Sequence, residues 1–270
     1  MQINRLSPHA GYIWIRQGMW LFKQSPFTFL MLVFLYIFVV QLSMFVPILG
    51  LFLVLILNPV IAVGFLTACQ KVILKELVKP SIYISPLKDL GPQVRLNLLK
   101  LGGIYALLIV LLSLLAAQFV DVEKILPLLT NNQMSAPEMI QEMSTAIIVG
   151  ACLYMPIAIL MWFSPQLVAW QGMSVFKALF GSWMGFWLNK GAFFVYFSTW
   201  AVILIAIPLI LGALFDAIGM AQYASYLITP LSMWALTVLY CSFFATWKGC
   251  FLDSIQNSEP NLQTLNQPIE

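Results

Sequence analysis

The chain has 270 residues, of which 61% are hydrophobic and only 9% are charged, and its formal net charge is +3. Soluble domains carry about 25% charged residues, so this composition excludes an ordinary soluble fold. Several apolar runs reach the roughly 20 residues that a helix needs to cross a bilayer. They lack the alternation of polar and apolar residues that marks membrane-barrel strands, and we therefore predict an all-α integral membrane protein.

Residues 8–24 are predicted to form an amphipathic helix at the membrane surface. Its polar residues share one arc: His9, Arg16, Gln17, Lys23 and Gln24. Large apolar residues fill most of the remaining surface, which is typical of a helix that lies in the membrane interface. Ser25 and Pro26 then predict the start of the next helix, because proline is tolerated in a first turn.

About six membrane spans follow, which we expect to form three helical hairpins. Their predicted limits are 27–46, 51–72, 101–120, 145–169, 192–215 and 226–247. The segment 71–100 is the most basic part of the chain, and three prolines divide it into short pieces. Residues 1–252 are thus predicted to form a single polytopic domain. The tail 253–270 is polar and is expected to be disordered.

The basic residues predict the orientation of the spans. With the N-terminus in the cytoplasm, twelve of the 13 Lys and Arg residues fall on the inner side and only Lys124 on the outer side. This bias is the positive-inside signal, so we expect both termini in the cytoplasm. The basic inner face could also bind anionic headgroups, although orientation during insertion explains the same charges. Nothing in the sequence indicates a nucleic-acid partner.

A weak internal repeat accompanies the three hairpins. Each odd-numbered span follows a segment that ends in a lysine, and each even-numbered span has a proline in its outer half: Lys23, Lys100 and Lys190; Pro59, Pro156 and Pro230. One interpretation is a triplicated unit with a pathway at the repeat interface. The other, which we favour, is that these prolines kink helices for packing.

The segment 170–190 has two unlike faces at helical spacing. One face is small and polar and includes Ser174, Ala178, Gly181, Ser182 and Gly185. Small residues at this spacing let another helix approach closely, so we predict a helix-docking stripe. The opposite face is large and apolar, and would sink into lipid or cover the bundle. Six tryptophans map near the inner interface and are expected to form an aromatic belt: Trp14, Trp20, Trp170, Trp183, Trp187 and Trp247.

The sequence carries no pattern that indicates catalysis. His9 is its single histidine, and it contains no HExxH, GxSxG or phosphate-binding glycine loop. We therefore predict a protein that is not an enzyme and has no cofactor and no metal, and we interpret the four cysteines as packing residues. No charged residue lies near the centre of a span, where ion-coupled transporters usually carry one. If a polar groove exists, Asn58 and Gln166 are candidate ligand-binding residues, because each neighbours a proline that frees backbone carbonyls.

Two segments resemble known families. The opening of the chain carries Ile3-Asn4-Arg5, Gly11, Trp14, Gly18, Leu21-Phe22-Lys23 and Pro26. This pattern resembles a family of uncharacterised polytopic proteins, about 270 residues long, from the inner membrane of Gram-negative bacteria. More distantly, Phe176-Lys177-Ala178-Leu179 with Ser182 and Lys190-Gly191 is similar to a motif in the membrane domain of glycerophosphoryl diester phosphodiesterases. The first resemblance implies a multi-pass protein of the bacterial cytoplasmic (inner) membrane. The second carries over no activity, because the sequence contains no counterpart of the phosphodiesterase catalytic domain.

Two functional hypotheses follow. The first is a non-enzymatic membrane module that organises lipids or membrane-protein partners at the inner leaflet, and the absence of a coupling residue favours it slightly. The alternative is a transporter or exporter of an amphiphilic or lipid-like solute. The fold discriminates between them: a polar cavity between the hairpins favours transport, and a dry bundle favours the module.

Overall fold

The computed structural model of the protein describes residues 3–46, 48–120 and 143–251. These ranges are helical and contain no strand, which confirms the predicted all-α class. Six helical segments are long and apolar enough to cross a membrane: Pro26–Ser43, Leu49–Ile73, Pro92–Ala117, Ser144–Gln171, Lys190–Ala217 and Ala221–Phe251. The predicted outer position of Lys124 and the predicted disorder of the tail at 253–270 concern residues outside the described ranges.

The first hairpin consists of α2 (Pro26–Ser43) and α3 (Leu49–Ile73), and it follows α1 (Ala10–Gln24). After α3 the chain forms two short helices, η1 (Pro80–Ile84) and α4 (Ser85–Asp89). η1 and α4 each carry a proline in the first turn, where the missing N–H group is not needed for a helical hydrogen bond. The prolines of the basic segment therefore begin its helices as well as divide it.

The second hairpin pairs α5 (Pro92–Ala117) with α8 (Ser144–Trp162). Its first helix begins at Pro92 rather than near residue 101, because hydropathy reveals only the apolar part of α5. The turns before that part carry Arg95, Asn97 and Lys100, which are compatible with a helix but not with a bilayer core.

The third hairpin has a continuous but irregular first span. α11 (Lys190–Ala201) passes into a π-helical turn, η2 (Val202–Ala206), and then into α12 (Ile207–Ala217). Pro208 is the second residue after the π turn and lacks the N–H group that the regular helical ladder requires. The return span is α13 (Ala224–Phe251), preceded by the short helix η3 (Ala221–Tyr223).

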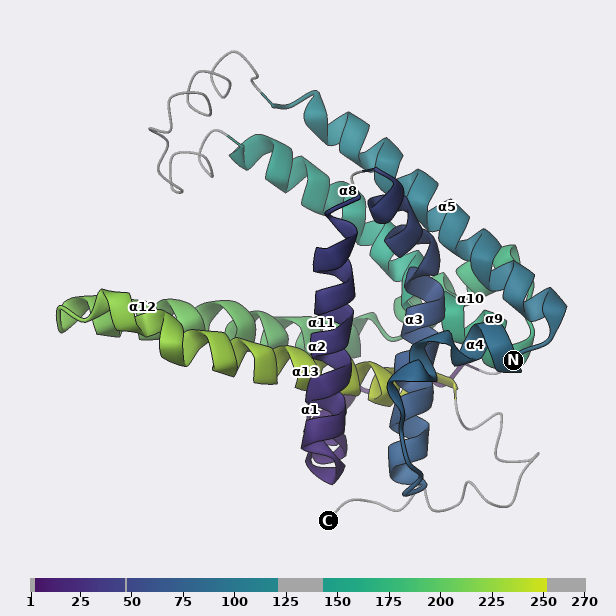
Figure 1. Ribbon diagram of the computed structural model, residues 1–270, viewed down its shortest axis with the longest axis horizontal. Helices are drawn as coiled ribbons and strands as arrows, with labels where there is room; N and C mark the ends of the chain where they lie inside the picture. Colours follow the sequence, from purple (N-terminus) through teal and green to yellow (C-terminus); the bar gives the residue numbers. More distant parts are fainter. Residues whose placement is uncertain (1–2, 47, 121–142, 252–270) are drawn as a thin grey trace.

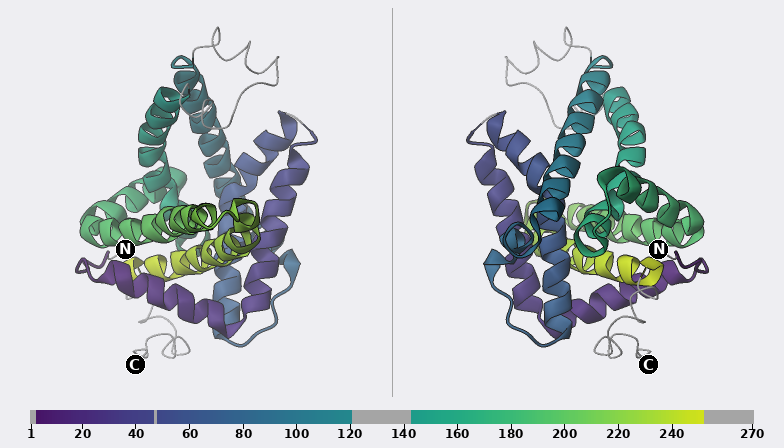
Figure 2. Two further views of the ribbon diagram at one scale, coloured as in Figure 1. Left: turned by 90° about the vertical axis from the view of Figure 1, so that its left-hand side faces the viewer. Right: turned by 90° about the vertical axis from the view of Figure 1, so that its right-hand side faces the viewer.

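The three hairpins diverge from a common base (Figures 1 and 2). Figure 2 shows the turn of the first hairpin and the end of α5 on the side of the molecule opposite to α1. In Figure 1, α12 and the start of α13 extend away from the other two hairpins. Two further helices, α9 (Ser164–Gln171) and α10 (Val175–Leu188), connect the second hairpin to the third near this base.

Helix α1 is more than a surface helix. It packs along α13 and against α11, and Trp14, Ile15 and Leu21 are buried. The approach is close because a glycine lies at the crossing: a methyl group added at Gly18 would lie 2.6 Å from the Cβ of Ser242. Most of the polar arc, including Arg16, is exposed. α1 thus packs on the bundle with one face and exposes the other.

The expected aromatic belt is wrong for two of its six tryptophans. Trp14 is 2% exposed and Trp247 is 1% exposed, so neither faces lipid. The Trp14 ring centroid lies 5.1 Å from that of Phe193, and the Trp247 centroid lies 4.8 Å from that of Phe251. The reason is that the helices of the base pack on one another and bury part of their aromatic surface inside the protein.

The outer surfaces of the spans are largely uncovered. In the most apolar window of each span, between 11% and 39% of the residues are buried. α12 buries none of its residues, and Leu209 is 68% exposed. Apolar surface on this scale is typical of helices that face lipid. The hairpins are therefore held together mainly at their base.

Candidate functional site

A cavity of about 630 Å³ lies where the three hairpins part. Side chains from all three hairpins line it, with further contributions from η1, α9 and α10. Its volume falls in the range of about 300–1,000 Å³ that small-molecule sites occupy. A cavity that needs every hairpin for its wall is the clearest candidate for a functional site in the described part of the chain.

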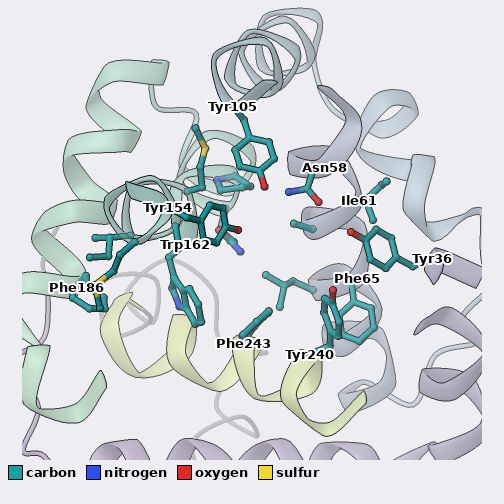
Figure 3. A pocket seen from close by; sticks show the side chains of 18 of the residues that line it. Tyr36, Asn58, Ile61, Phe65, Tyr105, Tyr154, Trp162, Phe186, Tyr240 and Phe243 are labelled. Carbon is teal, nitrogen blue, oxygen red and sulfur yellow. The ribbon is translucent and has the colours of Figure 1, made fainter. Parts of the chain in front are cut away.

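Tyrosine hydroxyls and one amide are turned toward the centre of this cavity. Figure 3 shows Tyr36 from α2, Asn58 from α3, Tyr105 from α5, Tyr154 from α8 and Tyr240 from α13 around one open space. Among the described residues that line the cavity, none is Asp, Glu, Lys, Arg or His. The polar part of the wall is therefore neutral, and it can donate and accept hydrogen bonds.

Two of the tyrosines pack on one another. The ring centroids of Tyr36 and Tyr240 lie 6.1 Å apart in an edge-on arrangement. Tyr83 has a backbone partner instead, because its hydroxyl donates to the Leu32 carbonyl over 2.8 Å. Burial raises the pKa of Tyr83, so its phenol stays neutral.

The rest of the wall is aromatic and aliphatic. The ring centroids of Trp162 and Phe243 lie 4.7 Å apart in an edge-on contact, and Phe65 lies beside Tyr240 at 5.6 Å. Trp162 Nε1 donates to Thr246 Oγ1 over 3.2 Å, which fixes the indole. Such a wall suits hydrocarbon, while the few neutral polar groups can fix the orientation of a polar head.

Asn58, one of the two candidates from the sequence, is partly buried and lines the cavity from α3. The next residue, Pro59, has no N–H group to donate to the carbonyl of Leu55, one turn earlier. The proline therefore leaves a backbone acceptor near the Asn58 amide. The structure places this residue in a polar setting inside a span.

Gln166, the other candidate, lines the same cavity from α9. It is 4% exposed, and its Oε1 atom is buried without a hydrogen-bond partner among the described residues. Leaving a buried acceptor unpaired costs about 1–3 kcal/mol, so such a group in a folded protein calls for an explanation. The structure thus brings together two residues that lie far apart in the sequence.

The position of Gln166 depends on a break between α8 and α9. The N–H group of Phe163 donates to Ser182 Oγ over 3.0 Å, and this hydroxyl donates to the carbonyl of Ile159 over 2.6 Å. The Ser182 hydroxyl is thus inserted between two backbone groups that a regular helix would join directly. Pro165, two residues after Phe163, has no backbone N–H group to continue the helix, and the chain turns here into α9.

Ser182 belongs to the proposed helix-docking stripe on α10. Ala178, Gly181, Ser182 and Gly185 are buried, and α10 packs on α8 and α9. Ser174 is exposed and precedes the helix, so it does not join the others. The stripe therefore lies against the helix pair that carries Gln166 into the cavity.

The tyrosines of the cavity were missed by the sequence reasoning. Each stands alone in an apolar span, at Tyr36, Tyr105, Tyr154 and Tyr240. A phenol hydroxyl inside a bilayer needs a partner, and this requirement is the signal that could have found them. Their convergence on one cavity depends on helices distant in the sequence, which one sequence does not reveal.

A comparison with known proteins identifies a relative of the chain. The chain is 37% identical over 256 residues to the probable inner membrane protein BTH_II0599 of Burkholderia thailandensis, and the match covers 93% of this chain and 94% of that protein. The chain belongs to the same family of inner membrane proteins. No family model matches the chain, and no solved structure does. The predicted multi-pass inner-membrane location is thereby confirmed by the relative and by the six apolar spans.

Proposed function

We propose that this inner membrane protein binds an amphiphilic, lipid-like molecule in the cavity between its hairpins and lets that molecule pass through the membrane. One observation carries the proposal: the cavity combines an apolar wall with a ring of neutral polar groups, contributed by all three hairpins. A hydrocarbon chain would contact the aromatic wall, and a polar head would bond to the tyrosine hydroxyls and amides.

The cavity favours transport over the first hypothesis, a dry module that organises lipids or partners. A dry bundle would fill the space between the hairpins with apolar side chains. Here the hydroxyls of Tyr36, Tyr105 and Tyr240 point into the space instead. These hydroxyls lie inside membrane spans, where a polar group without a use is unfavourable.

The chemistry of the wall supports passage without ion coupling and without catalysis. Among its described residues no carboxylate, lysine, arginine or histidine can exchange a proton or bind a coupling ion. It likewise presents no serine, threonine or cysteine as a nucleophile. Movement down a concentration gradient between the leaflets is the mode that this wall supports best.

The base of the molecule supports contact with the inner leaflet and its anionic headgroups. On α10, Phe176 is 80% exposed and Phe180 is 66% exposed, and both can enter the acyl region. Lys177 beside them is exposed, and Lys190 Nζ lies 5.1 Å from the ring centroid of Trp187. Basic residues at this position attract anionic lipid, which also supports a cytoplasmic location for both termini.

A flux assay in vesicles tests the proposed function. Purified protein is reconstituted with a small fraction of fluorescent lipid-like probes, and a membrane-impermeant reductant reports how quickly each probe reaches the outer leaflet. We expect faster exchange with the protein than without it. Asn58→Leu and Gln166→Leu should each slow this exchange. Gln41→Leu is the matched control, because Gln41 is exposed on α2 and does not line the cavity.

Two results would contradict the proposed function. If every probe class exchanges between the leaflets at the rate measured without protein, the proposed transport is wrong. If wild type, Asn58→Leu and Gln166→Leu exchange the probes at equal rates, the cavity is not the route.

A further inference from the structure

The side-chain amide of Gln166 is buried and unpaired inside the cavity wall. Its Oε1 atom has no hydrogen-bond partner among the described residues, and the residue is 4% exposed. Its Nε2 atom makes no hydrogen bond to these residues either. Because Gln166 lines the cavity, a ligand there is the nearest group outside the protein that could bond to this amide.

Two other polar groups of the cavity wall have hydrogen-bond partners in the protein. Tyr83 donates to the Leu32 carbonyl, and Trp162 donates to Thr246. Tyr36 and Tyr240 face each other across the cavity edge. Gln166 differs from these residues because it is almost wholly buried and no described residue satisfies its Oε1 atom. It is therefore the residue that a ligand would gain most from contacting.

We propose, building on the cavity's proposed function, that Gln166 selects ligands with an uncharged hydroxyl-bearing head. A primary amide offers one acceptor oxygen and two N–H donors, and a hydroxyl group can bond to either kind. The match holds whichever way the amide is turned, since a hydroxyl both donates and accepts.

The neutral wall excludes charged heads. A phosphate or carboxylate in this cavity would be removed from water with no cationic side chain among the described lining residues to compensate it. The basic residues lie instead at the base, where Lys177 and Lys190 are exposed. The ligand class is therefore a neutral amphiphile, such as an acylglycerol or a long-chain alcohol, rather than a phospholipid.

The size of the cavity sets how much of such a molecule is enclosed. A volume of about 630 Å³ suits a head with the first part of its chains. The remaining chain length would lie between the diverging hairpins, whose surfaces are apolar and largely exposed. A neutral amphiphile could thus keep its head on Gln166 while its chains stay in the bilayer.

Competition binding with three matched probes tests this inference. The full-length protein is held in detergent micelles with a radiolabelled short-chain diacylglycerol, and unlabelled probes compete for it. One competitor is the same diacylglycerol, one has its hydroxyl acetylated, and one has it phosphorylated to phosphatidic acid. These probes share their chains and differ only at the group that we place on Gln166.

We expect the free hydroxyl to compete about 2- to 10-fold better than the acetylated form, the range for one neutral hydrogen bond. Phosphatidic acid should compete least. In Gln166→Leu the free and acetylated forms should compete equally, and Gln166→Asn should keep part of the preference. Gln41→Leu should behave as wild type. Ala158→Trp, which fills the cavity from α8, should weaken binding of all probes.

The outcomes separate the inference from the proposed function. If the free and acetylated forms compete equally in wild type and Ala158→Trp abolishes both, then the cavity binds amphiphiles but water satisfies Gln166, and the inference fails alone. If phosphatidic acid competes best, the neutral ligand class is wrong. If no probe binds, or Ala158→Trp changes nothing, both proposals fail.

Discussion

The hydroxyl of Ser182 on α10 donates a hydrogen bond to the carbonyl of Ile159 on α8 over 2.6 Å. The same hydroxyl accepts the N–H group of Phe163 over 3.0 Å, so one buried side chain completes two backbone groups at the end of α8. The small residues around it let α10 come close enough for this contact. The α8–α9 break, and with it the position of Gln166, depends on this bond.

Replacing Ser182 with Ala should therefore destabilise the protein and disturb the cavity. The change leaves two buried backbone groups short of a partner, which costs about 1–3 kcal/mol. We expect a lower midpoint of thermal unfolding in detergent and slower exchange of the lipid-like probe. Ser174→Ala is the matched control, since Ser174 is exposed and its side chain makes no capping hydrogen bond. Equal unfolding midpoints for the two variants would contradict a structural role of the Ser182 hydroxyl.

The membrane spans and the all-α class could be predicted from the sequence, because they depend on residues close together in the chain. Long apolar runs predict spans, and prolines such as Pro26 predict helix starts. The same locality explains a difference: the sequence predicts a span from residue 101, whereas the helix α5 begins at Pro92, because its first polar turns carry no hydropathy signal.

The cavity could be predicted only in part. Asn58 and Gln166 attracted attention because prolines beside them free backbone carbonyls, and both line the cavity. That they share one cavity depends on contacts between different hairpins, which a single sequence does not reveal. The burial of Trp14 has the same origin, since it lies against Phe193 from a distant helix. Whether the two amides bind a ligand is a proposal that the flux and binding assays address.

A close helix crossing supplies the second prediction. Gly102 on α5 lies against the backbone of Ile56 on α3, and an added methyl group would overlap the Ile56 carbonyl. Backbone cannot move aside as a side chain can, so Gly102→Ala should force α3 and α5 apart. Overpacking of this kind costs about 1–3 kcal/mol. We expect a lower unfolding midpoint and, because Asn58 lies only two residues from Ile56 at this crossing, weaker probe binding.

The adjacent residue provides the control for this crossing. Gly103 has no atom within 4 Å of an added methyl group, so Gly103→Ala should be neutral or slightly stabilising. Both variants make the same chemical change in the same helix. A loss of stability in Gly103→Ala as large as that in Gly102→Ala would mean that the crossing is not where the effect arises.

Tyr83 supplies a prediction about pH. Burial raises the pKa of Tyr83, so the folded protein holds the phenol proton more tightly than the unfolded chain does. In the unfolded chain a tyrosine has a pKa of about 10. The contribution of Tyr83 to the free energy of unfolding is thus fully present below about pH 10 and decreases as the pH rises above it. Tyr83→Phe has no such proton to lose. We expect the gap in unfolding midpoint between wild type and Tyr83→Phe to be constant at neutral pH.

Above about pH 10 this gap should narrow, because only the wild type loses the contribution of Tyr83. At neutral pH the wild type should be the more stable form, since the variant lacks the hydrogen bond to the Leu32 carbonyl. A gap that widens at alkaline pH would have the opposite sign and would show that Tyr83 is not buried as described. Thermal unfolding in detergent across a pH series measures this directly.

The distribution of charge leads to the final prediction, the orientation of the hairpins. Lys88 on α4 is exposed at the basic end, and Gln222 on η3 is exposed at the turn of the third hairpin. In a background with Cys69, Cys152, Cys241 and Cys250 replaced by Ala, either position is changed to cysteine and treated with a membrane-impermeant maleimide. With the basic residues inside, Gln222→Cys should react in intact spheroplasts and Lys88→Cys only after lysis. The reverse labelling would place both termini outside and remove the inner-leaflet role proposed for α10.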